Sequence, residues 1–465
     1  MRKQIYLIQP TYRDARGRLL QGKRMPYASL ALPALSTTVP ASWEKEFCLE
    51  YFDDVNYETD ASVIGISSMG YDILHGMEIA REFKRRGKRV LFGGPQARLT
   101  MERLGPVADA IVHGHPGPRE MSGILQDALE GKLSAEYHCG VHLNYPFDYS
   151  VLQRAQLDFT PVLMGVGCRW NCTFCCTAAL HEGSYRLRNL QHVIADLGSV
   201  CRTSRKAVFV DANIYNNRGY LLRLCRRIRE MDGGLHWGAQ CTVDIGDDEE
   251  VLDGLRAAGC LLLILGLETL GQANLDQVGK PVRADLHRER VKRIRDAGIA
   301  VGGYFILGLD GDTAESFDAV FDFIHDGGIA LPVLNLLLPA PGTRMFDQLK
   351  REHRLLVDDE EDFLVNNTLY ATACNRSFYV PKNMTAAEAE EKFTKLYARL
   401  SSFREILRRS ITSSPTLTAA LFALNCAMRR EYRAMVAEGG CRRTPAVSRG
   451  ETPADLQPSW RDGCR

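Results

Sequence analysis

One stretch of the sequence predicts both a buried strand and a metal site: Pro161-Val162-Leu163-Met164-Gly165-Val166-Gly167-Cys168-Arg169-Trp170-Asn171-Cys172-Thr173-Phe174-Cys175. Its first half is an apolar run that is typical of a buried strand. Its second half places Cys168, Cys172 and Cys175 in a C-x3-C-x2-C pattern on one tight loop. Three such thiolates can ligate three irons of a 4Fe–4S cluster and leave the fourth iron open to a small chelating molecule. The stretch therefore predicts a strand that ends in an iron–sulfur site.

A zinc knuckle and simple buried cysteines are the alternatives for this loop. A structural zinc site takes four ligands, usually from two C-x2-C-like units or from cysteine with histidine. No matching second unit follows in the sequence. Cys176 offers a fourth thiolate, but it adjoins Cys175, and adjacent residues rarely both reach one tetrahedral ion. The spacing therefore favours the cluster.

Length and composition exclude several classes of protein. The 465 residues predict two or three domains, and 45% hydrophobic with 25% charged residues is ordinary for a soluble protein. A net charge of +1 argues against a nucleic-acid partner. No apolar run is long enough to span a bilayer, and the first residues lead into a strand instead of a signal peptide. The 14 cysteines form no disulfide-like framework, so we expect a cytoplasmic protein.

Residues 1–140 alternate strands and helices and predict a doubly wound parallel sheet, with any ligand at the carboxyl ends of its strands. The expected strands are residues 5–8, 47–52, 63–67, 89–94 and 110–114, and the expected helices are residues 71–86 and 121–129.

A linker over 141–160 precedes a second α/β domain over 161–345. Its six expected strands are residues 162–166, 207–211, 235–240, 261–266, 301–306 and 332–337. Six βα units predict a partial (β/α)6 barrel, in which active residues gather at the carboxyl ends of the strands. Residues 346–436 predict a helical C-terminal domain, and the Gly-, Pro-, Arg- and Ser-rich residues 437–465 predict a disordered tail.

The cysteine pattern, following its strand, resembles the signature of the radical S-adenosylmethionine (SAM) enzymes. In that family the open iron binds the amino and carboxylate groups of SAM, and reductive cleavage gives a 5′-deoxyadenosyl radical. The resemblance implies a SAM site at the strand ends of the barrel. Its expected residues are Phe174 and Ile306 near adenine, Arg186 or Arg188 on the SAM carboxylate, and Asp211, Gln240 and Glu268 on other polar groups. The alternatives are surface arginines, a helix-capping acid at Glu268 and ordinary loop packing for Phe174.

The first domain resembles the cobalamin-binding domain of many radical SAM enzymes, on residues 60–67, 90–97 and 109–114. The resemblance implies cobalamin contacts at Ser67, Gly93, Gly94, Gln96 and Gly114. The D-x-H-x-x-G motif of some cobalamin proteins is absent, and His115 stands where relatives often carry an acid. The alternative is a sheet that has lost its ligand and only shapes the substrate cavity.

The resemblance implies a radical C-methyltransferase that uses a 4Fe–4S cluster, SAM and cobalamin on a small-molecule substrate. An external electron donor such as flavodoxin or ferredoxin would reduce the cluster. Radical cyclisation, oxidation or rearrangement is the second hypothesis, and a non-catalytic iron–sulfur sensor is the third. His75, His115 and Tyr304 are expected either near the substrate or in ordinary packing.

Overall fold

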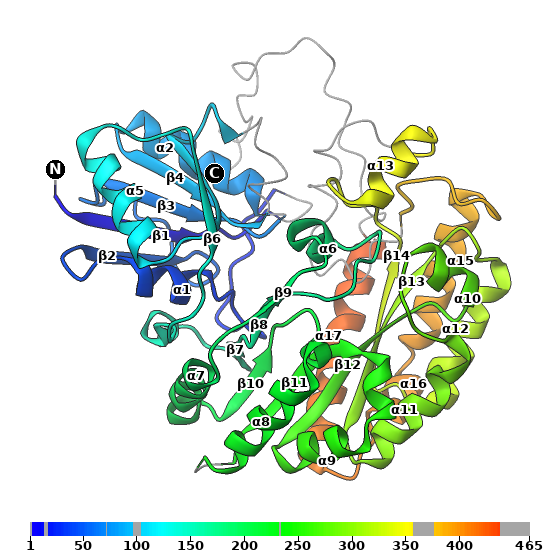
Figure 1. Cartoon of the computed structure of the whole chain (residues 1–465). Helices are drawn as coiled ribbons and strands as arrows, with labels where there is room; N and C mark the ends of the chain where they lie inside the picture. Colours follow the sequence, from blue (N-terminus) through cyan, green and yellow to red (C-terminus); the bar gives the residue numbers. More distant parts are fainter. Residues whose placement is uncertain are drawn as a thin grey trace, which may run out of the picture.

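The computed structural model describes residues 2–13, 17–70, 72–95, 104–231, 234–356 and 376–437. Figure 1 shows two α/β parts side by side, with a group of helices on the far side of the second. The predicted fold class is confirmed: a doubly wound sheet, a partial barrel of six parallel strands and a helical C-terminal part. No helix among the described residues is long and apolar enough to cross a bilayer.

The N-terminal sheet is parallel throughout, with strand order β2-β1-β3-β4-β5-β6. Its strands are β1 (Gln4–Gln9), β2 (Glu44–Leu49), β3 (Val63–Ser67), β4 (Arg89–Gly93), β5 (Ala110–His115) and β6 (Glu136–Val141). Helix α2 (Ile73–Arg85) packs on one face of this sheet, and α1 (Ala31–Thr38) and α5 (Pro118–Glu130) pack on the other. Both faces are therefore buried, as in other parallel sheets.

Two strands of this sheet differ from the prediction. Strand β2 lies at 44–49 instead of 47–52, because its first residues are exposed and polar and so carry no apolar signal. Strand β6 was not predicted, since its polar, aromatic and small residues show no clear apolar alternation.

The second sheet has the order β14-β13-β12-β11-β10-β7. Its strands are β7 (Thr160–Val162), β10 (Lys206–Phe209), β11 (His236–Thr242), β12 (Cys260–Glu268), β13 (Ala300–Leu307) and β14 (Leu331–Leu336). The helices between them are α7 (Leu190–Thr203), α8 (Arg218–Arg229), α9 (Glu249–Ala257), α10 (Gln272–Gln277), α11 (His287–Asp296) and α12 (Ala314–Gly327). One large apolar core joins the sheet to these helices.

The first predicted barrel strand is broken in two. β7 ends at Val162, and β8 (Gly165–Gly167) leaves the sheet to pair antiparallel with β9 (Tyr185–Leu187). The chain turns here because both oxygens of Asp211 accept hydrogen bonds from the N–H groups of Met164 and Gly165. This turn carries the cysteine loop away from the strand end.

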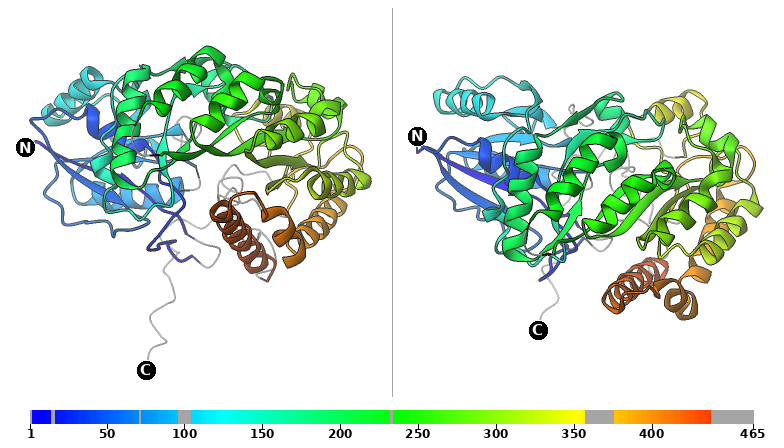
Figure 2. Two further views of the ribbon diagram at one scale, coloured as in Figure 1. Left: turned by 90° about the horizontal axis from the view of Figure 1, so that it is seen from below. Right: turned by 60° about the horizontal axis from the view of Figure 1, so that its bottom comes forward.

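The C-terminal helices lie beside the barrel (Figure 2), and α15 contacts its last strand β14. They are α13 (Arg344–Arg351), α15 (Ala386–Leu400), α16 (Phe403–Ser410) and α17 (Pro415–Ala437). Thr385 and Glu388 form a capping box at the start of α15, which buries Phe393 and Leu400 against the barrel core. The predicted tail lies outside the described residues, apart from Ala437 at the end of α17.

Candidate active site

The cysteine loop lies between β8 and α6 (Cys176–His181) and is held from three sides. Thr173 donates its N–H to the oxygen of Val278 at 2.9 Å, and its own oxygen accepts from the N–H of Met345 at 3.1 Å. The guanidinium of Arg344 donates to the oxygen of Asn171. Backbone contacts from the residues after α10 and from α13 therefore fix the loop, so that the thiols are positioned by the fold.

The three thiols are close enough to perturb one another electrostatically. Burial raises the pKa of Cys172 to about 12 and raises the pKa of Cys168 as well, while the Lys280 ammonium lowers both. Iron ligation requires thiolates, so bound irons would have to supply the positive charge that offsets this burial.

The zinc alternative is not favoured by the arrangement of these sulfurs. Among the described residues, one group of side chains converges closely enough to hold a single metal ion, and the cysteine loop does not contribute to it. A zinc ion needs its ligands gathered around one point, whereas the thiolates of a 4Fe–4S cluster bind separate irons. Cys176 is exposed at the start of α6.

Asp211 has a positioning role that was not predicted. Its side chain is 1% exposed, and its two oxygens accept from Met164 N at 2.9 Å and Gly165 N at 2.8 Å. Burial raises the pKa of its carboxyl group to about 7 despite these bonds. In this structure the carboxylate shapes the turn that presents the cysteine loop, and its predicted contact with SAM stays a prediction.

Arg188 is engaged within the protein. The residue is 3% exposed, and its guanidinium pairs with the buried Asp196 at 2.8 Å. Its other donors bond the backbone oxygens of Leu143, Leu163 and Tyr145. The group therefore joins the linker to the barrel, and its predicted contact with the SAM carboxylate stays a prediction. Arg186, two residues earlier on β9, is exposed.

Glu268 ends β12 as predicted, and it forms a buried ion pair with Lys280 that sequence reasoning missed. Glu268 has a left-handed backbone (φ +62°) at a β-bulge, which turns its carboxylate toward the lysine. A Cβ on Gly266 would lie 2.6 Å from both charged groups, so the pair also explains this glycine. The Lys280 ammonium lies 5.7 Å from the ring centroid of Trp170 in the cysteine loop. No periodicity or motif around Lys280 signals this role.

Phe174 and Ile306 pack on the same apolar cluster. Both are partly buried, and the cluster also contains Val278, Leu309 and Leu337. The cluster joins the cysteine loop to the ends of β13 and β14. Gln240 is half-buried near the end of β11. The predicted contacts of these residues with SAM stay predictions.

Five buried polar atoms at this edge of the barrel have no hydrogen-bond partner among the described residues. They are Thr173 Oγ1, Tyr185 Oη, Asn216 Nδ2, Thr242 Oγ1 and Asp244 Oδ1. An unmet buried donor or acceptor is costly, so these atoms offer hydrogen bonds to a polar ligand or to ordered water. Sequence reasoning missed them, although Asn216 closely follows β10 and Thr242 ends β11, the positions where barrel sites gather.

Asn216 also contacts the cysteine loop. Its Oδ1 accepts the N–H of Arg169 at 3.2 Å and lies 3.7 Å from the Cys168 sulfur. Asn213 donates to the same oxygen, which leaves the Asn216 amide N–H₂ as the unpartnered end. The side chain is therefore oriented with its donors available to a ligand beside Cys168.

The carboxyl edge of the N-terminal sheet carries the residues expected to contact cobalamin. Ser67 is buried at the end of β3, and Gly93 ends β4. Gly94 has φ +106°, and a Cβ there would lie 2.0 Å from the oxygen of Ser68. Gly114 (φ +82°) sits in a bulge, where a Cβ would lie 2.2 Å from the oxygen of Cys139. Local packing thus requires both glycines, and their contacts with cobalamin stay predictions. Gln96 lies outside the described residues.

The histidines and Tyr304 expected near the substrate have different surroundings. His75 is buried between Glu50 and Glu78 within the N-terminal part, with both nitrogens 2.8 Å from a carboxylate oxygen. Burial, together with a smaller effect of His181 on α6, lowers the pKa of His115 to about 4. Burial raises the pKa of Tyr304 on β13, and Tyr27 from the N-terminal part raises it further.

These last two electrostatic interactions join the N-terminal part to the barrel. His115 ends β5 and His181 ends the helix that follows the cysteine loop, so the carboxyl edge of the first sheet faces the cluster side of the barrel. Tyr27, which influences the pKa of Tyr304, belongs to a segment that pairs with the linker through Met25 and Leu157. Figure 1 shows α6 between the two sheets.

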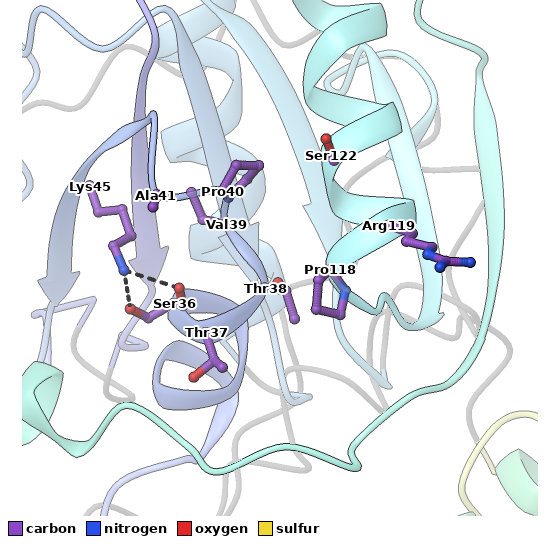
Figure 3. Close-up of a pocket in the computed structure, with 10 residues that line it drawn as sticks. All are labelled: Ser36, Thr37, Thr38, Val39, Pro40, Ala41, Lys45, Pro118, Arg119 and Ser122. Atoms are coloured by element: carbon purple, nitrogen blue, oxygen red, sulfur yellow. Dashed lines mark hydrogen bonds between the residues drawn. The ribbon is translucent and has the colours of Figure 1, made fainter.

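A surface cavity lies elsewhere in the molecule. It measures about 720 Å³ and opens between α1 and the first turns of α5 (Figure 3). All of its lining residues belong to the N-terminal part, and its Lys45 ammonium is already bonded to the oxygens of Ser36 at 3.1 and 3.2 Å. This cavity is separate from the cysteine loop.

Residues 162–324 match the Radical SAM superfamily. The barrel is a radical SAM domain. Over 409 residues the chain is 25% identical to bacteriochlorophyllide d C-8(2)-methyltransferase of Chlorobaculum tepidum, with 83% of this chain and 88% of that protein covered. The relative thus aligns with the radical SAM domain together with the sheet that precedes it.

Two solved structures share this fold over both of its α/β parts. The radical SAM methyltransferase TsrM from Kitasatospora setae, with cobalamin and a [4Fe-4S] cluster bound, superimposes with a TM-score of 0.68 at 16% identity, over 94% of this chain and 100% of TsrM. The cobalamin-dependent radical SAM enzyme OxsB, with aqua-cobalamin and SAM bound, gives 0.66 at 11% identity, over 94% of this chain and 72% of OxsB. At these identities the two structures establish the fold.

Proposed function

We propose that this chain is a radical SAM enzyme that methylates an unactivated carbon of a small molecule with the help of cobalamin. The observation that supports the proposal is that the two cofactor edges face each other, with α6 between the two sheets (Figure 1). His115 at the end of β5 is near enough to His181, at the end of the helix that follows the cysteine loop, for that second histidine to lower its pKa. In a doubly wound sheet the ligand binds at the carboxyl ends of the strands, and in a barrel the active residues gather at the same ends. A substrate between these edges would reach both cofactors.

The residues present fit a cluster and SAM. Three thiols lie on one loop that backbone hydrogen bonds fix in place. Buried polar atoms of Asn216, Thr242 and Asp244 have no hydrogen-bond partner among the described residues. The aromatic ring of Phe174 and the side chain of Ile306 offer an apolar surface for adenine. We propose that Arg186, which is exposed on β9, binds the SAM carboxylate.

The N-terminal edge fits a broad, largely apolar ligand. Met69, just after β3, is 51% exposed, although large apolar side chains are usually covered. The next residue, Gly70, has open space where a Cβ would stand. Beside them, Ser67 and Gly94 complete the strand ends. We propose that the face of a corrin covers Met69 and approaches the backbone at Gly70.

When bound, the cluster with SAM supplies a 5′-deoxyadenosyl radical and the cobalamin supplies a methyl group. The chain itself orients these groups and keeps water out. Asp211 holds the turn that presents the cysteine loop, and the buried Glu268–Lys280 ion pair lies beside Trp170 of that loop. His115 is neutral at neutral pH because burial lowers its pKa to about 4, so it adds no charge between the two edges.

The relatives support a small-molecule carbon as the methyl acceptor. The aligned Chlorobaculum tepidum protein is a bacteriochlorophyllide d methyltransferase, and its alignment covers most of both chains. We extend this to a tetrapyrrole-sized or smaller organic substrate. An external donor of the flavodoxin or ferredoxin type and a cytoplasmic location complete the proposal, because the cluster must be reduced and protected from oxygen.

Anaerobic purification with cobalamin supplied tests the proposal. We expect iron–sulfur absorbance near about 400 nm from charge transfer of thiolate-bound clusters, together with cobalamin bound one to one. SAM and a reductant should then give 5′-deoxyadenosine, measured by mass spectrometry. Full cluster loading without 5′-deoxyadenosine would indicate an iron–sulfur sensor. 5′-Deoxyadenosine from a protein that never retains cobalamin would favour radical cyclisation, oxidation or rearrangement.

A further inference from the structure

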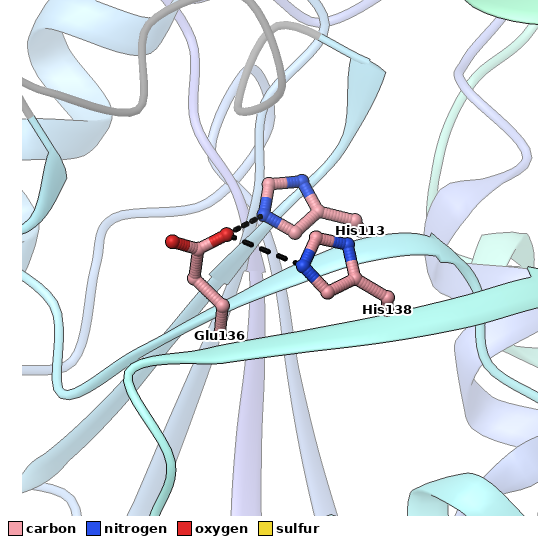
Figure 4. Close-up of side chains that lie close together, drawn as sticks. All are labelled: His113, Glu136 and His138. Carbon is pink, nitrogen blue, oxygen red and sulfur yellow. Dashed lines mark hydrogen bonds and ion pairs between the residues drawn. The ribbon is translucent and has the colours of Figure 1, made fainter.

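A second group of metal-ligand residues lies on the N-terminal sheet, remote in sequence from the cysteine loop. His113 is on β5, and Glu136 and His138 are on the neighbouring edge strand β6 (Figure 4). The parallel register pairs His113 with His138 and Ile111 with Glu136. Since side chains two residues apart on a strand share a face, all three side chains lie on one face of the sheet.

The three side chains converge on one point. The Nε2 atoms of His113 and His138 lie 3.1 and 3.4 Å from the same carboxylate oxygen of Glu136. The two imidazole rings stack with centroids 4.8 Å apart and an angle of 12° between their planes. One ligand atom from each residue lies within 4.8 Å of the others, and this is the group among the described residues that is arranged to hold a single ion.

We propose that His113, Glu136 and His138 bind one Zn²⁺ ion. Two ligand atoms at 2.0–2.1 Å from one tetrahedral zinc lie about 3.4 Å apart, which is close to both nitrogen–oxygen distances. Two imidazoles with one carboxylate select zinc-like transition metals over Mg²⁺ or Ca²⁺, which prefer oxygen ligands. The site goes beyond the proposed function and does not depend on it.

The exposure of the three residues suits an ion taken up from solution. His113 is 8% exposed and forms the floor of the site, while Glu136 and His138 have side-chain exposures of 37% and 74%. Water can therefore supply the fourth ligand, as in zinc sites with three protein ligands.

Other histidine–carboxylate pairs in the chain lack the second imidazole. His142 lies 3.3 Å from Glu120, and His325 lies 3.0 Å from Glu405. Each is an ordinary hydrogen-bonded pair. His142 also lies just beyond β6, with its side chain 55% exposed, so it provides a matched control.

The bound ion would tie the edge strand to its neighbour. β6 has no further strand on its outer side within the described sheet, and edge strands are the most easily opened part of a sheet. Directly after the site, Gly114 forms a bulge against Cys139, so pairing beyond His113 is irregular. Zn²⁺ would bridge β5 and β6 just before this irregularity and hold the strand that leads toward the linker.

Zinc binding to the cluster-loaded full chain tests the site. Equilibrium dialysis against ZnCl₂ under anaerobic conditions, with metal analysis by mass spectrometry, should find one more tightly bound zinc per wild-type chain than per His138→Ala chain. We expect His138→Ala to weaken this zinc by at least about ten-fold, since even loss of an outer partner of a ligand costs that much. His138 is largely exposed, so the variant should fold. Cluster loading occupies the thiols of the cysteine loop.

His142→Ala is the matched control and should bind zinc as the wild type does. Glu136→Gln, which keeps size but removes the charge, should weaken zinc binding in the same direction as His138→Ala. Hydrogen exchange gives an independent readout: Zn²⁺ should slow exchange of the β6 amides in the wild type and leave His138→Ala unchanged. Equal zinc binding by wild type and His138→Ala, or an equal loss in His142→Ala, would overturn the proposal.

Discussion

The two carboxyl edges that face each other in this molecule satisfy their polar groups in opposite ways. At the barrel edge, buried atoms of Asn216, Thr242 and Asp244 have no partner among the described residues. At the edge of the N-terminal sheet, most buried polar groups pair internally. Ser68 donates to Asp72 at 2.5 Å, and His75 bridges two glutamates. The buried Gln9 Oε1 at the end of β1 is the exception among the described atoms of that edge.

This difference indicates two modes of recognition. The barrel edge offers side-chain donors and acceptors to a polar ligand, as SAM requires. At the N-terminal edge, most buried polar groups are hydrogen-bonded to one another, and Met69 is exposed beside Gly70. This arrangement suits contact with the face of a large, flat cofactor. Changes at the barrel edge should therefore act on chemistry and SAM binding, and changes at the sheet edge on stability and cobalamin binding.

The largest expected effect is at the cysteine loop. Cys172→Ala removes one of three iron ligands, so cluster content should fall and 5′-deoxyadenosine formation should be abolished. Iron analysis and mass spectrometry of the nucleoside product measure both. The adjacent, exposed Cys176 gives the control, and Cys176→Ala should retain iron and turnover. Loss of the cluster in both variants would return Cys176 to the ligand set.

Lys280→Met should destabilise the barrel by about 3–5 kcal/mol, because it leaves the Glu268 carboxylate buried without its cation. Urea unfolding measures this change. The double variant Lys280→Met with Glu268→Gln should recover most of the stability, since no buried charge remains. If Glu268 also binds SAM, the double variant should still bind SAM poorly. A double variant as unstable as the single one would show that the ion pair is not the cause.

The free energy of unfolding should depend on pH through His75. Burial lowers the pKa of His75, but its hydrogen bonds to Glu50 and Glu78 outweigh this and raise the pKa to about 9, above about 6.5 in an unfolded chain. Its stabilisation is therefore complete below about pH 6.5 and is lost as the pH rises through 9. The full span is about 3 kcal/mol at most.

His75→Gln should remove this pH dependence, measured by urea unfolding at about pH 6 and about pH 9.5 on either side of the transition. His142→Gln, at an exposed pair, should leave the dependence unchanged. A wild type whose stability is flat across this range would contradict the charged His75.

The smallest expected effect is at Met69. Covering an exposed methionine contributes about 1–2 kcal/mol, so Met69→Asp should weaken cobalamin binding by about ten-fold. Absorbance titration with cobalamin measures this affinity, while the cluster content should not change. Leu356→Asp, at another exposed apolar side chain, is the control. Equal cobalamin affinity in wild type and Met69→Asp would remove Met69 from the proposed face.

Local sequence signals predicted much of this molecule. The cysteine spacing, the six barrel strands and the capping box at Thr385 depend on residues a few positions apart, so they are visible in the chain itself. Prediction failed where a signal is weak or a partner is distant. The edge strand β6 has no clear alternation, and the carboxylate of Asp211 is turned inward by two backbone N–H groups 46 and 47 residues away.

The fold class and the three thiols of the cysteine loop could be predicted from the sequence, because covalent spacing places the thiols on one turn. Which charged groups are exposed depends on the folded structure. Arg188 and Arg186 are indistinguishable by spacing, yet one is buried against Asp196 and the other is exposed. Strand register likewise brought His113 beside Glu136 and His138. Burial and pairing across distant segments fix what a charged or polar side chain can still bind, and these are properties of the folded chain.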